Sequence, residues 1–213
     1  MNAGEHTPGA WALPSGGRDA TPAPDERGVQ QHQAGTAFLG MVIFMASWAM
    51  LFAGLFFAYG VVRAGAHPWP PTDMPDLPLG LPATATLALA LSSYGLHEAL
   101  ARARATGKGV ARLVGAAAAL GAIFLLLQAR VWGSLWHLGL TPDAGPYASV
   151  FYGLTVFHAL HVALGVLALG WLTVRAARRR YTPLAHIPLR LWTLYWHMVG
   201  VVWGLMYLLV YVL

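Results

Sequence analysis

The chain has 213 residues, of which 57% are hydrophobic and only 10% charged, whereas a soluble globular protein carries about 25% charged residues. This composition excludes an ordinary soluble protein and predicts an integral membrane protein, and the lack of cysteine excludes disulfides, thiolate metal sites and cysteine nucleophiles. The net charge of +5 would suggest nucleic acid as the partner of a soluble protein, but the basic residues here cluster between hydrophobic stretches, so we expect no nucleic acid.

Residues 1–34 are rich in glycine, proline, alanine and polar residues. They contain no apolar run long enough for a cleavable signal peptide. We therefore expect a disordered or partner-bound N-terminal tail. Residues 35–213 are expected to form a single transmembrane domain.

Five stretches of the chain are long and apolar enough for transmembrane helices, which need about 20 mostly apolar residues. They cover about residues 36–62, 80–101, 112–132, 146–174 and 189–213. The connection at residues 64–79 holds several prolines, which prevent one continuous helix. The sequence thus predicts an all-α membrane protein with five transmembrane helices.

The distribution of basic residues predicts the orientation. If the five stretches alternate in direction, eleven of the thirteen Lys and Arg residues fall on one side. Only Arg63 and Arg130 fall on the other. Because cytoplasmic loops carry an excess of Lys and Arg, we expect a cytoplasmic N-terminus and a periplasmic C-terminus.

Three histidines lie deep in the predicted spans, where ionisable groups are costly and are functional candidates by default. His158 and His161 lie three residues apart in FYGLTVFHALHV, so a helix places them on one face. His197 lies at comparable depth in YWHMVGVVW. The three could form a metal or haem site, belong to a proton path, or make structural hydrogen bonds.

The surrounding sequence favours the structural interpretation. The spacing of three residues differs from the usual helical zinc pair, and no carboxylate lies deep in a span to support a metal or carry protons. The expected partners of the histidines are Thr155, Tyr195, backbone carbonyls or lipid head groups. Since the chain has no GxSxG, HExxH or P-loop motif either, we expect no catalytic, metal-binding or cofactor-binding residues.

Several of these stretches together resemble subunit III of the haem–copper oxidases in its short, five-helix bacterial form. The resemblance rests on residues 151–162, residues 195–203 and the run FMASWAMLFAGLFFAYGVVR that ends at Arg63. Shorter agreements add Trp69, Pro70, Pro71, Leu91, Ser92, Ser93, Gly121, Phe124 and Gln128. The similar region covers about residues 35–213.

Three positions depart from that family. Trp48 stands where the family usually has a glutamate after the serine, and Val131 where it has a glutamate after the glutamine. Gly200 stands where it has an aspartate. Each change removes an acid, so functions that depend on those acids in relatives do not transfer to this chain. We therefore expect the cleft beside these positions to be more apolar than the corresponding cleft in the family's other members.

The resemblance implies a subunit without redox centres in a bacterial inner-membrane terminal oxidase, a proton-translocating cytochrome c oxidase. Haem and copper would lie in partner subunits I and II, and the chain would hold phospholipid and support assembly, proton uptake and lasting turnover. The implied structural or lipid-contacting residues are Arg63, Gln128, His158, His161, Tyr195, Trp196, His197 and Trp203. The alternatives are subunit III of a quinol oxidase, an accessory subunit of a nitric oxide reductase and, more remotely, a haem-binding electron carrier or a transporter.

Overall fold

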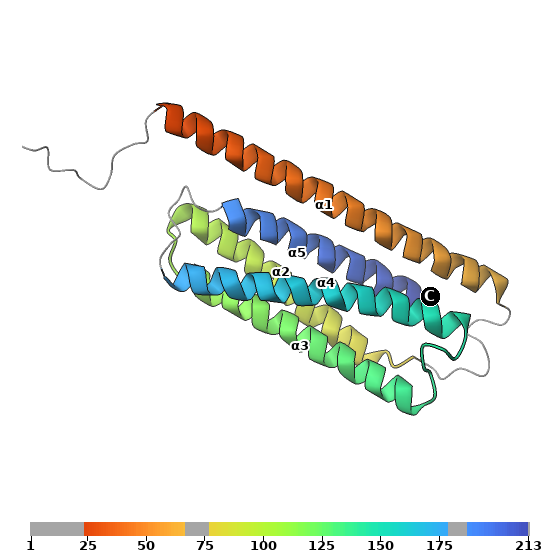
Figure 1. Ribbon diagram of the computed structural model, residues 1–213. Coiled ribbons are helices and arrows are strands. Elements are labelled where there is room, and N and C mark those ends of the chain that lie inside the picture. Colours follow the sequence, from red (N-terminus) through yellow and green to blue (C-terminus); the bar gives the residue numbers. More distant parts are fainter. Residues whose placement is uncertain (1–23, 67–76, 179–186, 213) are drawn as a thin grey trace, which may run out of the picture. The chain divides into compact units, whose positions relative to one another are not determined.

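The computed structural model describes residues 24–66, 77–178 and 187–212. These residues form five long helices and one terminal π-helical turn (Figure 1). The elements are α1 (Pro24–Gly65), α2 (Gly80–Ala105), α3 (Val110–His137), α4 (Pro146–Ala177), α5 (Ile187–Met206) and η1 (Tyr207–Val212). The expected all-α fold with five helices is therefore confirmed.

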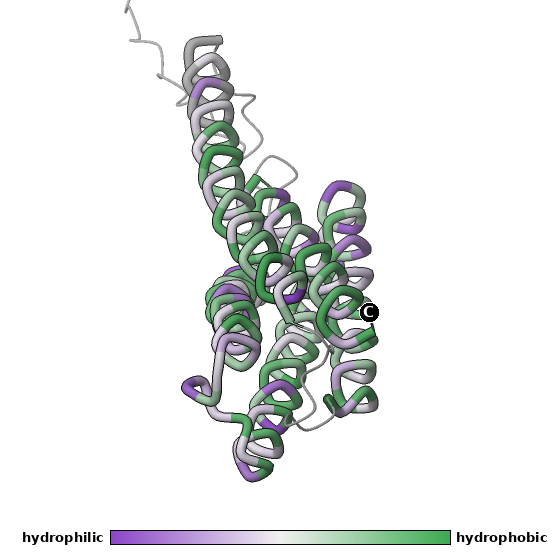
Figure 2. The backbone as a smooth tube through the Cα atoms, turned by 90° about the vertical axis from the view of Figure 1, so that its right-hand side faces the viewer, coloured by the Kyte–Doolittle hydropathy of each residue, from purple (hydrophilic) through white to green (hydrophobic). Residues whose placement is uncertain are grey.

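Four of the helical segments are long and apolar enough to cross a membrane, and Figure 2 shows hydrophobic residues along them. They are Gly35–Gly65, Val110–His137, Pro146–Ala177 and Ile187–Val212. Helix α2 is 26 residues long but less apolar on average, because Ser93, His97, Glu98, Arg102 and Arg104 interrupt its second half. Its crossing of the membrane stays a prediction.

Helix α1 begins at Pro24 rather than near residue 36, so the last part of the expected tail is helical. A proline suits the first turn of a helix, where its missing N–H would have no partner anyway. Among the described residues, those from Phe38 onward form one compact unit, and residues 24–37 belong to a separate one. The tail predicted at residues 1–23, and the Trp69-Pro70-Pro71 motif, lie outside the described residues.

Helices α2 to α5 form a ring in which α3 packs against α2 and α4, and α5 packs against the other side of the same two helices. The turn from α2 into α3 uses Gly107 and Gly109, whose φ angles of 67° and 75° lie in the left-handed region that favours glycine. Helix α1 contributes the buried side chains of Trp48, Phe52 and Tyr59 to the same core. The core thus draws on all five helices.

The chain end differs from the expected regular helix. The π-helical turn η1 follows α5, and its Leu209 carbonyl accepts hydrogen bonds from two side chains of α1. The Tyr59 hydroxyl donates at 3.0 Å and Arg63 Nη1 donates at 3.4 Å. Arg63, singled out in the sequence, therefore joins the end of α1 to the end of the chain.

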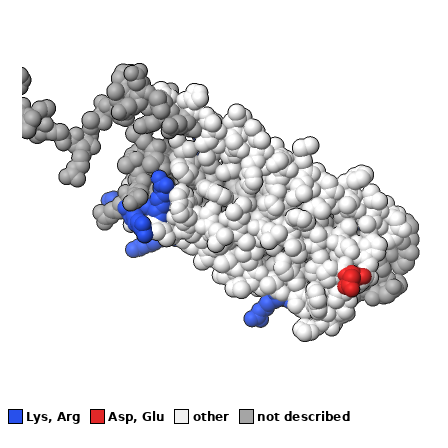
Figure 3. All heavy atoms as spheres, viewed as in Figure 1, with Lys and Arg blue, Asp and Glu red and all other residues white. Residues whose placement is uncertain are grey.

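Charged residues gather at the helix ends. Arginines end α2 and α4 and begin α5, and Figure 3 shows blue basic side chains at one end of the molecule's visible face and a red acidic one near the other. Asp143 follows α3, and a hydrogen bond from the Thr141 side chain lowers the pKa of its carboxyl. This arrangement agrees with the charge asymmetry on which the predicted orientation rests.

Candidate functional site

Trp196, from the YWH motif, is fully buried where α2, α3, α4 and α5 meet. Its Nε1–H donates to the Ser92 hydroxyl on α2 at 3.0 Å, and that hydroxyl donates to the Ala117 carbonyl on α3 at 2.8 Å. A Cβ atom added to Gly165 would lie 2.5 Å from the indole, and one added to Gly121 would lie 2.7 Å from it. Both glycines are therefore required by the close approach of this ring.

Two further tryptophans repeat this type of contact. Trp132 on α3 donates from Nε1 to the Thr155 hydroxyl on α4 at 3.1 Å. Trp203 on α5 donates from Nε1 to the Thr86 hydroxyl on α2 at 2.8 Å. An indole N–H can only donate, so a ring that is buried or partly buried in the bundle needs an acceptor, and here a hydroxyl on a neighbouring helix supplies it. Thr155, one of several partners considered for the histidines, thus accepts from Trp132 and donates to the Phe151 carbonyl.

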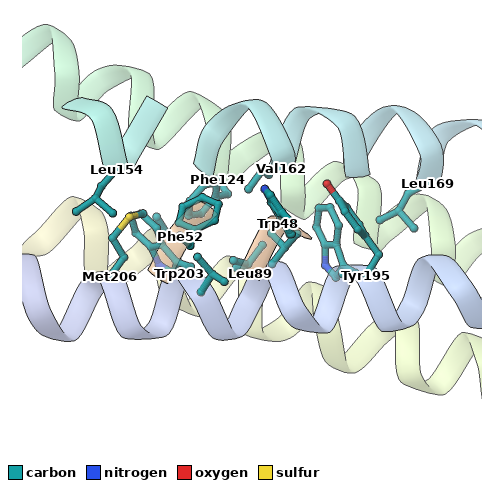
Figure 4. Close-up of a cluster of buried hydrophobic side chains, with 14 of the residues drawn as sticks. Trp48, Phe52, Leu89, Phe124, Leu154, Val162, Leu169, Tyr195, Trp203 and Met206 are labelled. Atoms are coloured by element: carbon teal, nitrogen blue, oxygen red, sulfur yellow. The ribbon is translucent and has the colours of Figure 1, made fainter. Parts of the chain in front are cut away.

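His158 lies fully buried among aromatic rings. Its ring centroid is 5.4 Å from Trp203, 5.7 Å from Phe124 and 6.2 Å from Phe52. Neither imidazole nitrogen has a hydrogen-bond partner among the described residues. Figure 4 shows the three aromatic side chains that surround it together in the core between the helices.

His161, one turn further along α4, packs against α1. Its ring centroid lies 3.9 Å from the Trp48 indole and 5.8 Å from Phe52. Its Nδ1 is 2.6 Å from the Phe157 carbonyl, which can only accept, so this nitrogen carries the proton. The Tyr195 hydroxyl donates to the backbone carbonyl of His161 at 3.0 Å. The imidazole is therefore paired within its own helix.

Tyr195 and Trp48 complete this contact between α1, α4 and α5. Their rings are almost parallel, with an interplanar angle of 10° and centroids 5.3 Å apart (Figure 4). Trp48 is only 4% exposed, and its indole nitrogen is the exception among these tryptophans, because no described group accepts its proton. The position where the family resemblance would place a glutamate is thus filled by a buried ring.

His197 faces α2 instead of α4. It is half-buried, its ring centroid lies 6.4 Å from that of His97, and it lines two hollows between α2 and α5. The three deep histidines therefore have three different environments. Within the described ranges, no three His, Asp or Glu side chains lie close enough together to hold a metal ion.

The remaining sequence candidates lie in or beside the core. Gln128 is 1% exposed, and its carboxamide lies near the Tyr211 hydroxyl. Neither group forms a hydrogen bond of standard geometry, with the other or with any further described residue. Val131 is 1% exposed, so a carboxylate at this position would be strongly disfavoured. Gly200 is half-buried, and a Cβ there would lie 3.5 Å from the Ser93 hydroxyl, which leaves room for a side chain.

Sequence reasoning missed two groups of residues. Thr86 and the role of Ser92 as an acceptor had no signal, because the pairing of a tryptophan with a hydroxyl on another helix depends on the packing. His97 was not among the candidates, and the arginines at the ends of α2 and α5 were interpreted only as topology signals. The arginines that share a helix end with a histidine could have been recognised from the sequence as a candidate polar site.

Comparison with known proteins gives a consistent result. The family model described as cytochrome c oxidase subunit III matches residues 27–213. Cytochrome c oxidase subunit 3 of a Synechocystis species is 37% identical over 176 residues, covering 82% of this chain and 74% of that protein. Cytochrome c oxidase subunit 3 of Thermostichus vulcanus is 33% identical, and the match covers 82% of this chain and 86% of that protein. A probable cytochrome c oxidase subunit 3 of Nocardia farcinica is 34% identical, and the match covers 78% of this chain and 82% of that protein.

Proposed function

This chain belongs to the cytochrome c oxidase subunit III family, and from that premise we propose that it is the non-catalytic subunit III of a bacterial haem–copper terminal oxidase. The complex reduces O2 to water with electrons from cytochrome c. This chain carries no redox centre of its own. Haem and copper belong to subunits I and II, beside which it packs in the inner membrane.

The observation that carries the proposal is how the deep polar side chains are used. The indole N–H groups of Trp132, Trp196 and Trp203 all donate to hydroxyls on other helices. His161 is paired within its own helix, and His158 is enclosed by aromatic rings. Polar groups used in this way hold helices together, which suits a subunit that supports a neighbour.

We assign the chain three supporting roles: assembly of the complex, retention of phospholipid, and stability of proton uptake and turnover. The residues proposed for packing or lipid contact are Arg63, Gln128, His158, His161, Tyr195, Trp196, His197 and Trp203. Trp48, Val131 and Gly200, which replace family acids, take no part in proton transfer. The catalytic subunit therefore receives its protons without a carboxylate from the deep core of this chain.

The proposed topology has five crossings, with the N-terminus in the cytoplasm and the C-terminus in the periplasm. It counts α2 as a span, because α2 packs between α3 and α5, which are both apolar enough to cross. The arginines at the ends of α2 and α4 and the start of α5 then all face the cytoplasm. The N-terminal tail lies on the same side.

The names of the relatives favour cytochrome c over quinol as the electron donor, and an oxidase over a nitric oxide reductase. No separate observation supports an electron carrier or a transporter. The test is purification of the tagged chain from its native membrane in a mild detergent, followed by identification of the proteins that stay attached. We expect haem-containing oxidase subunits in equal amounts with the chain; a chain that purifies alone, or with a nitric oxide reductase, would contradict the proposal.

A further inference from the structure

Three polar side chains from three different elements meet in the core around the ring of Trp203. They are Gln128 of α3, His158 of α4 and Tyr211 of η1, with exposed fractions of 1%, 0% and 6%. The Trp203 ring lies between the latter two, with its centroid 5.4 Å from that of His158 and 6.2 Å from that of Tyr211. A buried polar cluster therefore lies beside the packed aromatic rings of Figure 4.

The packing of α3 against α4 directs Gln128 into this cluster. Phe124, one turn before it on α3, lies against the His158 ring, with centroids 5.7 Å apart. Trp132, one turn after it, donates its indole proton to the Thr155 hydroxyl of α4. Because side chains four residues apart share one face of a helix, the carboxamide faces α4 between these two contacts.

The polar atoms of the cluster need partners that the neighbouring side chains do not supply. No described residue forms a hydrogen bond with either carboxamide atom of Gln128, either imidazole nitrogen of His158 or the Tyr211 hydroxyl. The nearby Thr155 and Tyr152 hydroxyls already donate to backbone carbonyls. Since a buried polar group without a partner is costly, the five atoms together point to a ligand in the core.

The chemistry of these atoms identifies the ligand as water. The carboxamide N–H groups and the hydroxyl proton need acceptors, whereas the carboxamide oxygen and the unprotonated imidazole nitrogen need donors. A water molecule offers both and typically makes about three hydrogen bonds to buried polar groups of this kind. A metal ion is a poorer match, because within the described ranges no three His, Asp or Glu side chains lie together.

We propose that bound water joins Gln128, His158 and Tyr211 as an internal hydration site. The water links α3 and α4 to the terminal turn η1, whose hydroxyl and the carboxamide lie near each other without a direct bond of standard geometry. This site adds to the proposed function a ligand inside the bundle. It does not depend on the oxidase assignment, because the same buried atoms need the same partner in any complex.

The site is tested by X-ray radiolysis, which generates hydroxyl radicals from bound water and so modifies buried rings beside it. The full tagged chain is purified in a mild detergent with the subunits that stay attached, irradiated, and mapped by mass spectrometry. Trp203, which is 1% exposed, should be modified. Trp196 is the matched control, since it is also buried and also donates to a hydroxyl on α2, and it should stay unmodified. A Trp203 ring modified no more than Trp196 would overturn the proposal.

A variant shows whether the modification depends on the cluster. Gln128→Leu keeps a similar volume, removes the carboxamide and should abolish the modification of Trp203. Tyr207→Phe, which removes a hydroxyl from the same terminal turn, should leave it unchanged. Trp203 also lines a hollow between α2 and α5. Modification that persists in Gln128→Leu would therefore come from that hollow and would overturn the proposal.

Thermal unfolding separates bound water from a dry core and from a direct bond. In a dry core, replacing the unpartnered amide of Gln128 by leucine would raise the unfolding temperature or leave it unchanged. With water bound, Gln128→Leu should lower it, because the Tyr211 hydroxyl and the water lose a partner. An unchanged or raised temperature would overturn the proposal. A lowered temperature without modification of Trp203 in the unaltered chain would show a direct bond to Tyr211 and would overturn it equally.

Discussion

The imidazole of His161 lies directly against the indole of Trp48, with ring centroids 3.9 Å apart. The contact joins α4 to α1. The Tyr195 ring of α5 stacks on the same Trp48 indole, with ring centroids 5.3 Å apart. A histidine that first suggests a metal ligand is therefore one element of an aromatic cluster between three helices. Trp48, which stands where the family resemblance would place a glutamate, contacts both other rings of this cluster.

The chain should react weakly with hydrophobic carbodiimides, which label carboxylates inside the bilayer. The sequence from residue 38 to residue 65 contains no Asp or Glu, and Trp48 stands where the family resemblance would place a glutamate. Mass spectrometry of the labelled complex would measure the modification. Trp48→Glu should gain labelling in α1 and lose stability, because it puts a carboxylate in a site that is 4% exposed. Strong labelling of α1 in the unaltered chain would contradict this account.

Replacing His161 by alanine should shorten the working lifetime of the oxidase more than it lowers its initial rate. The variant removes the ring that packs on Trp48 and Phe52, and the proposed function assigns this ring no step of the chemistry. Oxygen consumption followed from the first turnovers to inactivation separates the two effects. His137→Ala, at the exposed end of α3, is the control and should change neither. Loss of the initial rate in a fully assembled complex would count against a structural role.

Gly165→Ala should destabilise the bundle because the new methyl would lie 2.5 Å from the Trp196 ring, which is fully buried. Overpacking of this kind costs about 1–3 kcal/mol. Gly170→Ala, on the same helix, meets nothing within 4 Å and should be neutral or slightly stabilising. Thermal unfolding of both purified variants compares them directly, and equal transition temperatures would show that the ring can move aside.

Ser92→Ala should weaken the same region by about 1 kcal/mol, the scale of interhelical hydrogen bonds in membranes. The change leaves the Trp196 N–H without its acceptor and removes the bond to the Ala117 carbonyl. Ser93→Ala, the neighbouring residue on α2, is half-buried and serves as the control. The expected readout is a lower unfolding temperature for the first variant alone. An equal decrease in both would mean that the hydrogen bond contributes nothing specific.

Much of the fold follows from local pattern. Apolar length alone placed α3, α4 and the start of α5 within a few residues, because a helix is the only cheap way to satisfy backbone groups in lipid. The early start of α1 at Pro24 and the π-helical end at Tyr207–Val212 were not predicted. The first has no hydrophobic signal because its residues are mostly polar. The second is as apolar as the rest of its span, so composition does not distinguish a π-helical turn from an α-helix, and its contacts with Tyr59 and Arg63 come from a distant helix.

The sequence could predict which residues belong to the candidate site, but not how they are arranged in space. The sequence identified His158, His161 and His197 as unusual, and it could place the first two on one face of a helix. It could not show that His197 turns toward His97 on α2, since the rotation of one helix against another depends on side-chain packing. The need for a glycine at residue 165 likewise becomes visible only in the structure, where the Trp196 ring lies against it.

The most direct test of the central claim follows the haem when this chain is separated from its complex. The oxidase is purified through the tagged chain in a mild detergent, the chain is then released with a harsher one, and haem is measured in both fractions by pyridine haemochrome spectra. The account predicts that haem and O2 reduction stay with the remaining subunits and that the released chain carries none. Stoichiometric haem on the released chain would contradict it.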